Sequence, residues 1–589
     1  MLCSSGALQS LAVRRNLYEG MVRSLTHGVG RALARTRRRV LSTVIVVALC
    51  LSAFACTSQD DPTDGSETSG ETDGRRSSSN RGWLETACSL PPSTLRIVER
   101  GTVADRSPDV VFLPQRPNFI GGFDYTSHSG AENFLQRVPL VFYGPGFIPA
   151  RGELELQREV TVADIAPTIA DLIGTPFPRN RSGRVIREAL LPADERAGKP
   201  ALVVVVVWDG GGINVLERWP EAWPHLKELT RNGTSVTNTI VGSSPSVTPA
   251  VHATIGTGSF PEDHLLVDTR LRVDGEVVDA WEDISPSLLR QPTLADLYDR
   301  AAGNVPLVGL VSEHPWHFGM MGRGASFPAG DNDIAVAFNA QGKSITNPSI
   351  YSLPASGVAV PGLEDAIRDL DSEDGAIDSR WMGGELEGNA KGTPAWTTYQ
   401  TRVIESVITA EGFGQDEVPD LFFTNYKQLD LVGHKFNMTN PEVRLALEYT
   451  DAQLPDLTAL LNRTVGPNRW VMAITADHGQ QPDAESLDAW PIGVQELAED
   501  LAEHLGVERD DLVEDTRVTG LWLDREVLSG AGATLGDAAD FMLDYTIEDN
   551  ASDDVPADYL SRRDERLIRA AMPASRVADA LDCSQKASD

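Results

Sequence analysis

The stretch "ALVVVVVWDGGG", residues 201–212, decides the fold class of this 589-residue chain. An unbroken apolar run ends at Asp209 and three glycines, and such a run is typical of a strand buried on both faces of a sheet. Similar runs occupy 138–144, 305–312 and 420–426, and the apolar part of "WVMAITADHG" (470–479). Helical patterns lie between most of them, so we expect an α/β fold with a mostly parallel central sheet.

Acidic and histidine side chains follow several of these runs. Asp477 and His478 come directly after the last one, while Asp430 and His434 stand four residues apart with Gly433 between them. Ligands gather at the carboxyl ends of parallel strands, and Asp and His are common ligands of divalent metals. Considered alone, each of these residues also fits a purely structural role, as a helix cap or a solvated surface group.

Thr248 and Pro249 open a helical pattern, which leaves two roles for the Thr248 hydroxyl. A threonine before such a proline is a common N-cap. A hydroxyl at a helix start also faces free backbone N–H groups, which suit a phosphoryl group. The two roles are compatible.

These motifs together resemble the alkaline phosphatase superfamily. The order is a strand ending in Asp209, Thr-x-x-x-His-x-x-x-x-Thr-Gly from Thr248, Asp-x-x-Gly-His from Asp430, and Asp-His-Gly from Asp477. The branch it resembles is the nucleotide pyrophosphatase/phosphodiesterase type. The resemblance implies a three-layer α/β sandwich with cap insertions and two divalent metal ions, usually Zn²⁺.

The resemblance also implies the ligands of both metals. Asp209, Asp477, His478 and the Thr248 hydroxyl would hold one ion, with Thr248 as the nucleophile that forms a phospho-threonine. Asp430 and His434 would hold the other ion, together with one more histidine that the family supplies from a late segment.

No residue after Asp477 supplies that histidine, because His504 lies in an amphipathic helical run and reads as a surface residue. The segments "TSHSG" (126–130), "VPLVFYGPG" (138–146) and 160–186 resemble the family's C-terminal piece. We therefore expect a circularly permuted chain in which His128 completes the second site.

The expected organisation follows from this permutation. Residues 83–589 would form one catalytic domain, in which 83–190 are the permuted C-terminal piece. Segments 325–415 and 485–580 are expected to form caps over the cleft.

The substrate predicted from the branch is a phosphodiester or a nucleotide pyrophosphate. Thr269 stands near the place of a family asparagine that contacts the phosphoryl group, and Arg270 follows it; these two are the candidate substrate contacts, although Arg270 fits a solvated hairpin residue equally well. A phosphomonoesterase on the same two-metal site and a non-catalytic surface binding protein are the alternatives.

The first 56 residues read as an export signal. A basic flank, an apolar run over 40–55 and Cys56 after "AFA" resemble a bacterial lipobox, which predicts lipidation of Cys56 and a membrane anchor through that lipid. Plain cleavage after Ala55 is the alternative. Residues 57–82 are polar and acidic, and we expect a disordered linker there. The predicted location is the cell envelope, on its periplasmic or extracellular face.

The net charge limits the expected binding partners, and the cysteine content predicts a disulfide. The net charge of −34 becomes −41 when residues 1–55, with eight arginines and one glutamate, are removed. Such a surface repels nucleic-acid duplexes, so a small phosphoester is the expected partner. Exported thiols tend to pair, and the permutation would bring the ends of the domain together, so we expect a Cys88–Cys583 disulfide.

Overall fold

The computed structural model of the protein describes residues 82–122, 125–386, 388–551 and 555–588. The expected signal segment, Cys56 and the linker up to residue 81 lie outside the described residues. Residues 79–589 form one compact unit.

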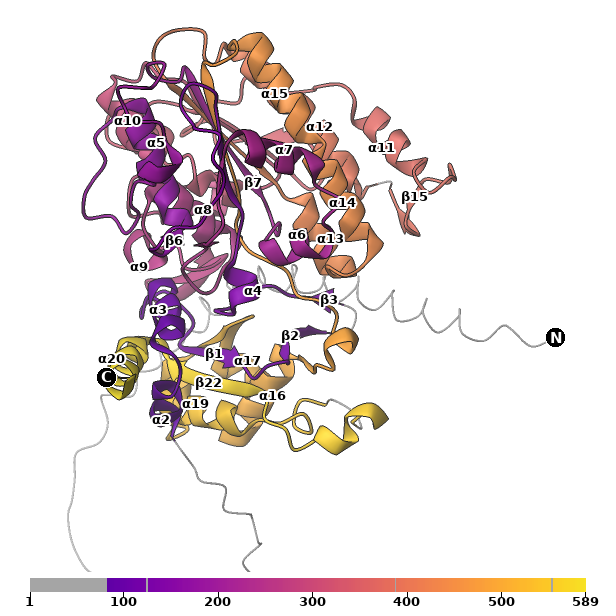
Figure 1. The fold of residues 1–589 in the computed structure, drawn as a ribbon. Coiled ribbons are helices and arrows are strands. Elements are labelled where there is room, and N and C mark those ends of the chain that lie inside the picture. Colours follow the sequence, from indigo (N-terminus) through magenta and orange to yellow (C-terminus); the bar gives the residue numbers. More distant parts are fainter. Residues whose placement is uncertain (1–81, 123–124, 387, 552–554, 589) are drawn as a thin grey trace, which may run out of the picture. The chain divides into compact units, whose positions relative to one another are not determined.

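A nine-stranded mixed sheet is the centre of this unit (Figure 1). Its order is β14-β13-β12-β17-β7-β18-β4-β8-β5, and the five strands from β13 to β18 run parallel. The strands are β4 (Leu140–Tyr143), β5 (Gly152–Leu154), β7 (Leu202–Trp208), β8 (Thr234–Val236), β12 (Val308–Ser312), β13 (Ile334–Phe338), β14 (Ser344–Ile345), β17 (Asp420–Tyr426) and β18 (Trp470–Ala476). The α/β class with a mostly parallel centre is confirmed.

Two of the expected strands differ from the pattern in detail. The run at 138–144 forms β4, which pairs antiparallel with both β18 and β8. The apolar pattern does not reveal this direction, because a strand enclosed on both sides is apolar whether it runs parallel or antiparallel. The run at 305–312 becomes regular only at Val308, and Val305 is 55% exposed.

Helices cover both faces of the sheet, which makes three layers. Along β7, Val203, Val205 and Val207 belong to one hydrophobic cluster, while Val204 and Val206 belong to the other. The first cluster includes residues of α5 (Ile165–Ile173), α8 (Thr248–Thr257) and α10 (Leu294–Ala301); the second includes residues of α7 (Pro224–Asn232), α12 (Pro394–Glu411), α14 (Pro441–Asp451) and α15 (Gln453–Thr464). This alternation explains why β7 has no polar face.

A second, four-stranded antiparallel sheet joins the two ends of the unit. Its order is β20-β21-β1-β22, so the early strand β1 lies between two late ones (Figure 1). The elements are β1 (Val110–Pro114), β20 (Val513–Arg517), β21 (Gly520–Leu523) and β22 (Ile568–Pro573), with α16 (Val494–Leu505) and α19 (Leu535–Asp544) contributing to its core.

The first and last helices of the described unit meet beside this sheet. Helices α2 (Trp83–Cys88) and α3 (Pro92–Gly101) contact the last helix, α20 (Val577–Ser588). A disulfide joins Cys88 to Cys583, with their Cα atoms 5.4 Å apart. Packing and a covalent bond therefore both fix the ends.

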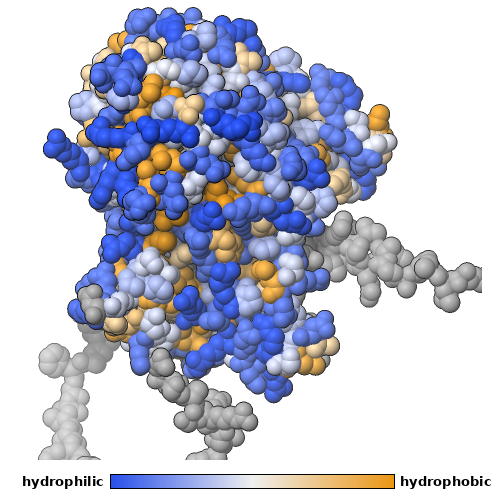
Figure 2. All heavy atoms as spheres, viewed as in Figure 1, coloured by the Kyte–Doolittle hydropathy of each residue, from blue (hydrophilic) through white to orange (hydrophobic). Residues whose placement is uncertain are grey.

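The two segments predicted to be caps contain different structures. Segment 325–415 contributes β13 to the main sheet and α12 to its helical layer, and 485–580 supplies most of the second sheet. Hydrophilic residues cover most of the face in Figure 2. No helix within the described ranges is both long and apolar enough to cross a membrane.

Candidate metal centre and active site

The carboxyl ends of β7, β17 and β18 supply most of the polar side chains of the site. Asp209 follows β7, and its N–H donates to the carbonyl oxygen of Tyr426 at the end of β17. Asp477 and His478 follow β18, and Asp477 Oδ1 accepts from the Gly210 N–H at 3.0 Å. These side chains are fully buried. The parallel register of the three strands thus brings together residues 268 positions apart.

Helix α13 (Gln428–Phe436) presents Asp430 and His434 one turn apart, with His434 Nε2 3.5 Å from Asp430 Oδ1. At Gly433 this helix lies against the Gln480 side chain, and a Cβ atom there would lie 2.1 Å from Gln480 Oε1 and displace that side chain. The Thr126 hydroxyl donates to the Gly433 carbonyl oxygen, and the Thr126 carbonyl oxygen lies 2.7 Å from His434 Nδ1. The segment 126–128 is therefore attached to this helix.

His128 lies at the centre of the second ligand set. Its Nε2 atom is 3.1 Å from Asp430 Oδ1, and its ring stacks on His478 with centroids 3.5 Å apart. The His434 ring centroid is 4.7 Å away. The structure therefore brings His128 to Asp430, while the exposed His504 on α16 packs against Phe541 instead.

Thr248 is the first residue of α8, and Val247 takes the N-cap position that the sequence allowed for the threonine. The Thr248 hydroxyl makes no capping bond and instead accepts from Lys427 Nζ at 3.0 Å. The side chain is 4% exposed. Its oxygen is thus turned toward the carboxylate cluster.

Lys427 is the residue that the sequence interpretation missed. Its Nζ atom contacts Asp209 Oδ1 at 2.8 Å and Asp430 Oδ2 at 2.7 Å, so it links both ligand sets to Thr248. Burial opposes its charge, but Asp209 and Asp430 raise its pKa above the ordinary value and keep it protonated. The sequence feature that could have identified Lys427 is a basic residue directly after a buried strand, three positions before Asp430.

The donor set fits divalent metal ions. Two groups, His128 with Asp430 and His478, and Asp209 with Asp477 and His478, each place their ligand atoms within 4.8 Å of one another. Zinc at about 2.1 Å from each of four donors requires neighbouring donors about 3.4 Å apart. His478 Nε2 lies 3.4 Å from Asp209 Oδ1 and 3.5 Å from Asp477 Oδ2, which matches that spacing.

The electrostatics of the site also favour a cation. Burial, with the nearby charge of Asp209, raises the pKa of Asp477 to about 7. Burial and the neighbouring His478 lower the pKa of His128 to about 3, so this imidazole is a neutral donor. Burial opposes protonation of His478, but Asp477 and Asp209 raise its pKa to about 9, so the three buried carboxylates hold a protonated imidazole as well as Lys427. A bound divalent ion would take the place of that proton.

Asp209 also lies close to two histidines and an asparagine that are not in the two ligand sets. His252 on α8 and His317 form a third close group with it, and Asn425 Nδ2 donates to Asp209 Oδ2 at 3.0 Å. His252 uses Nδ1 toward the Thr248 carbonyl oxygen and Nε2 toward Asn425. These contacts fix the position of Asp209 and the start of α8.

Comparison with known proteins identifies the family. The model of the type I phosphodiesterase / nucleotide pyrophosphatase family matches residues 203–527. The chain belongs to this family. The expected place within the alkaline phosphatase superfamily is thereby confirmed, and the protein is a phosphoesterase, a hydrolase with a metal-binding site.

The similar proteins include two alkaline phosphatases. PafA of Elizabethkingia meningoseptica is 22% identical over 405 residues, which cover 59% of this chain and 73% of PafA. PhoV of Synechococcus elongatus is 28% identical over 86 residues, 15% of this chain and 16% of PhoV. The crystal structure of wild-type PafA matches with a TM-score of 0.50 and 20% identity, over 63% of this chain and 84% of PafA, and supports the fold.

The two candidate substrate contacts make other interactions. The Thr269 hydroxyl donates to Asp268, and the Arg270 guanidinium donates to the Val277 carbonyl oxygen and lies 3.3 Å from Asp515. Their contact with substrate stays a prediction.

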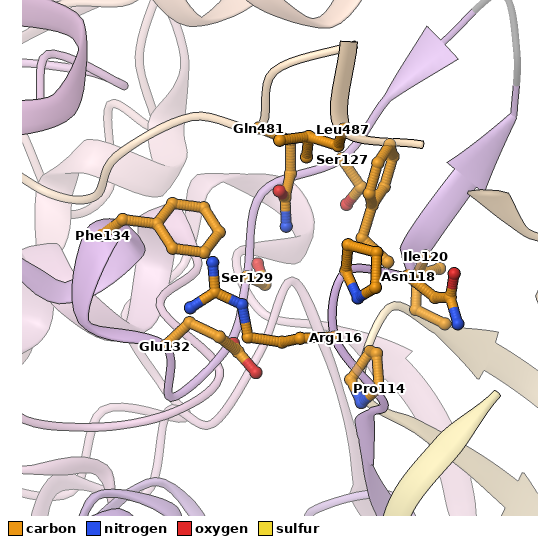
Figure 3. A pocket seen from close by; sticks show the side chains of 12 residues that line it. Pro114, Arg116, Asn118, Ile120, Ser127, Ser129, Glu132, Phe134, Gln481 and Leu487 are labelled. Carbon is orange, nitrogen blue, oxygen red and sulfur yellow. The ribbon is translucent and has the colours of Figure 1, made fainter. Parts of the chain in front are cut away.

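A pocket opens beside His128 (Figure 3). Ser127 and Ser129, which flank His128, line it together with Arg116, Asn118 and Phe134; its cavity volume is about 50 Å³, and it opens to solvent. The Arg116 guanidinium lies over the Phe134 ring, 4.9 Å from its centroid. The pocket thus offers one guanidinium group, one carboxylate, that of Glu132, and two aromatic rings, those of Phe119 and Phe134, next to the candidate ligands.

Proposed function

We propose that the protein hydrolyses phosphodiesters or nucleotide pyrophosphates through a phospho-threonine at Thr248. The observation that carries this proposal is the position of the Thr248 hydroxyl, 3.0 Å from a lysine that also contacts Asp209 and Asp430. The nucleophile would thus stand between the two ligand sets.

Two divalent ions, taken to be Zn²⁺, would be held by the two sets. Asp209, Asp477, His478 and the Thr248 hydroxyl form one set, and Asp430, His434 and His128 form the other. Such ions supply Lewis-acid stabilisation of oxyanions and activate oxygen nucleophiles at neutral pH.

The chain's own groups would act in sequence. The Thr248 hydroxyl would lose its proton to solvent, and the Lys427 ammonium would stabilise the negative charge left on the oxygen. This oxygen attacks phosphorus as the bond to the leaving oxygen breaks, and the leaving oxygen takes up a proton from solvent. The backbone N–H groups at the start of the ten-residue helix α8, where Pro249 supplies none, would face the phosphoryl oxygens. Water then cleaves the phospho-threonine and regenerates the hydroxyl.

The choice of diesters rests on the family description and on the pocket beside His128. A diester carries a second substituent, and the pocket could accept it, with Phe134 for stacking and Arg116 for a phosphate oxygen. A phosphomonoesterase is the second candidate, because PafA and PhoV are named alkaline phosphatases.

Isosteric variants test the nucleophile. Thr248→Val keeps the shape and removes the hydroxyl, so turnover of bis-p-nitrophenyl phosphate should fall at least about 10³-fold. Thr248→Ser keeps a hydroxyl and should retain a measurable rate and a trapped phospho-enzyme. Full activity in the valine variant would refute the proposed nucleophile.

A substrate panel separates the two candidate functions. kcat/KM is measured on bis-p-nitrophenyl phosphate, a nucleotide p-nitrophenyl ester and p-nitrophenyl phosphate. A monoester advantage of tenfold, about 1.4 kcal/mol, would favour the second candidate. EDTA should abolish all three activities, and a non-catalytic binding protein would instead purify without stoichiometric zinc.

We also propose that the chain is circularly permuted. In support, β4 lies between β18 and β8 although it precedes both in sequence, and the family match starts at residue 203 although His128 lies beside Asp430. His128→Ala should remove about one zinc per chain and nearly all turnover, whereas the matched control His504→Ala should do neither.

Export and lipidation of Cys56 remain proposals from the sequence. They predict that the protein fractionates with membranes and that Cys56→Ser releases it. Release of the unaltered protein without detergent would contradict the lipid anchor.

A further inference from the structure

A second group of carboxylates lies outside the catalytic centre. Asp331 and Asp333 precede β13; Asp331 is exposed, and Asp333 is 8% exposed. Asp299, in the last turn of α10, belongs to a different element and is 4% exposed. Ligand oxygens of the three residues lie within 4.8 Å of one another, and no residue is shared with the catalytic centre.

The burial of the Asp299 side chain gives separate evidence that this group of carboxylates binds a ligand. Its Oδ1 atom is buried and accepts from no N–H or hydroxyl group within the described part of the chain, and one of its carboxylate oxygens lies within 4.8 Å of those of Asp331 and Asp333. A buried carboxylate oxygen without a partner is costly unless a cation or donor reaches it.

No basic side chain neutralises this group. Among the described residues, Asp299, Asp331 and Asp333 form no ion pair with Lys, Arg or His. The neighbouring Asp296 adds negative charge, and its oxygens already accept from the N–H groups of Thr293 and Arg323. Burial, the charge of Asp331 and the direct contact between these two carboxyl groups raise the pKa of Asp299 to about 7, as expected where carboxylates crowd together without a cation.

We propose that Asp299, Asp331 and Asp333 bind one calcium ion. The donors are all carboxylate oxygens, which suit hard cations rather than zinc. Calcium accepts irregular sets of six to eight oxygens, whereas magnesium requires a near-ideal octahedron, and the exposed Asp331 leaves room for water ligands.

The ion would join α10 to the loop before β13. Helix α10 contacts α8, which begins at Thr248, and also α5. Calcium would therefore support the layer of helices that carries the proposed nucleophile, without touching the reacting atoms.

The test uses the full, zinc-saturated protein in calcium-free buffer, with CaCl₂ as the probe. We expect metal analysis to find one calcium per chain beside the zinc, and the melting temperature to rise by about 3 °C at saturating calcium. Asp299→Asn should lose the bound calcium and this shift, and it should keep its zinc and turnover of p-nitrophenyl esters. Its melting temperature without calcium should equal or exceed that of the unaltered protein, because the substitution removes charge repulsion. The exposed Asp194→Asn is the matched control and should behave as the unaltered protein.

Three results would overturn the proposal. These are no calcium binding up to about 10 mM, an equal response to MgCl₂, or unchanged calcium binding in Asp299→Asn. If that variant does not fold, Asp331→Asn provides the decision, because its exposed site tolerates substitution and its calcium affinity should fall at least tenfold. Zinc content and turnover are read separately, so a failure of the proposed phosphoesterase mechanism would not be mistaken for a failure of the calcium site.

Discussion

Removing the disulfide between Cys88 and Cys583 should weaken the whole catalytic unit. The two residues are 495 positions apart in sequence, yet their Cα atoms lie within 5.4 Å. The bond therefore closes nearly the entire described chain into one loop. The double variant Cys88→Ser/Cys583→Ser removes it without leaving a free thiol.

The size of the effect follows from the loop length. Chain-entropy arithmetic for a loop of this length gives about 6 kcal/mol at 25 °C. This value is a ceiling, because packing also holds the ends together: Ala87 and Leu90 pack with Ala580 and Leu581 in one buried cluster. With a urea dependence of about 3 kcal/mol per molar, the midpoint would fall by up to about 2 M.

Urea unfolding of the zinc-loaded protein measures this prediction. In reductant, the unaltered protein should unfold at the same urea midpoint as the double variant. Turnover at 25 °C should be unchanged in both, because neither cysteine is among the candidate site residues. A variant midpoint within about 0.2 M of the oxidised protein would refute the entropic argument. Loss of turnover in the folded variant would show that the bond supports the site itself.

Three further changes test other parts of the structure. Lys427→Met should lower kcat about 100-fold or more by removing the donor to the Thr248 oxygen, with the exposed Lys435→Met as control; a loss below threefold would contradict the role of Lys427. His264 is buried, and burial together with Arg181 lowers its pKa to about 3, so the folded state excludes the proton that the unfolded state binds below about 6.5. Stability should therefore fall by about 2 kcal/mol between pH 7 and pH 5 on account of His264, and His264→Gln, but not His504→Gln, should flatten this slope in denaturant melts. Gly256→Ala would place a Cβ atom 2.3 Å from the Gly319 carbonyl oxygen and should cost about 1–3 kcal/mol by forcing α8 away, so an unchanged melting curve would contradict the close approach.

The sequence by itself determined the sheet and most of the site's chemistry. Continuous apolar runs such as 201–208 identify strands enclosed on both faces, since burial selects side chains locally. Asp209 and Asp477 could be placed at strand ends from those runs alone. The four-residue spacing of Asp430 and His434 marked them as a candidate pair, and helix α13 places them one turn apart. The resemblance to the family led to His128 as a partner of Asp430, a placement that local patterns alone do not indicate.

Only the tertiary structure decided what these side chains contact. The direction of β4 is not encoded in its apolar run, because parallel and antiparallel strands inside a sheet are equally buried. No sequence motif singled out Lys427, and its role depends on the pairing of β7 with β17, which brings Asp209 within 2.8 Å of its ammonium group. Thr248 fitted an N-cap until its hydroxyl was seen to face that lysine. Asp299 joins Asp331 and Asp333 for the same reason: contacts between elements distant in sequence depend on packing, which local residue patterns do not specify.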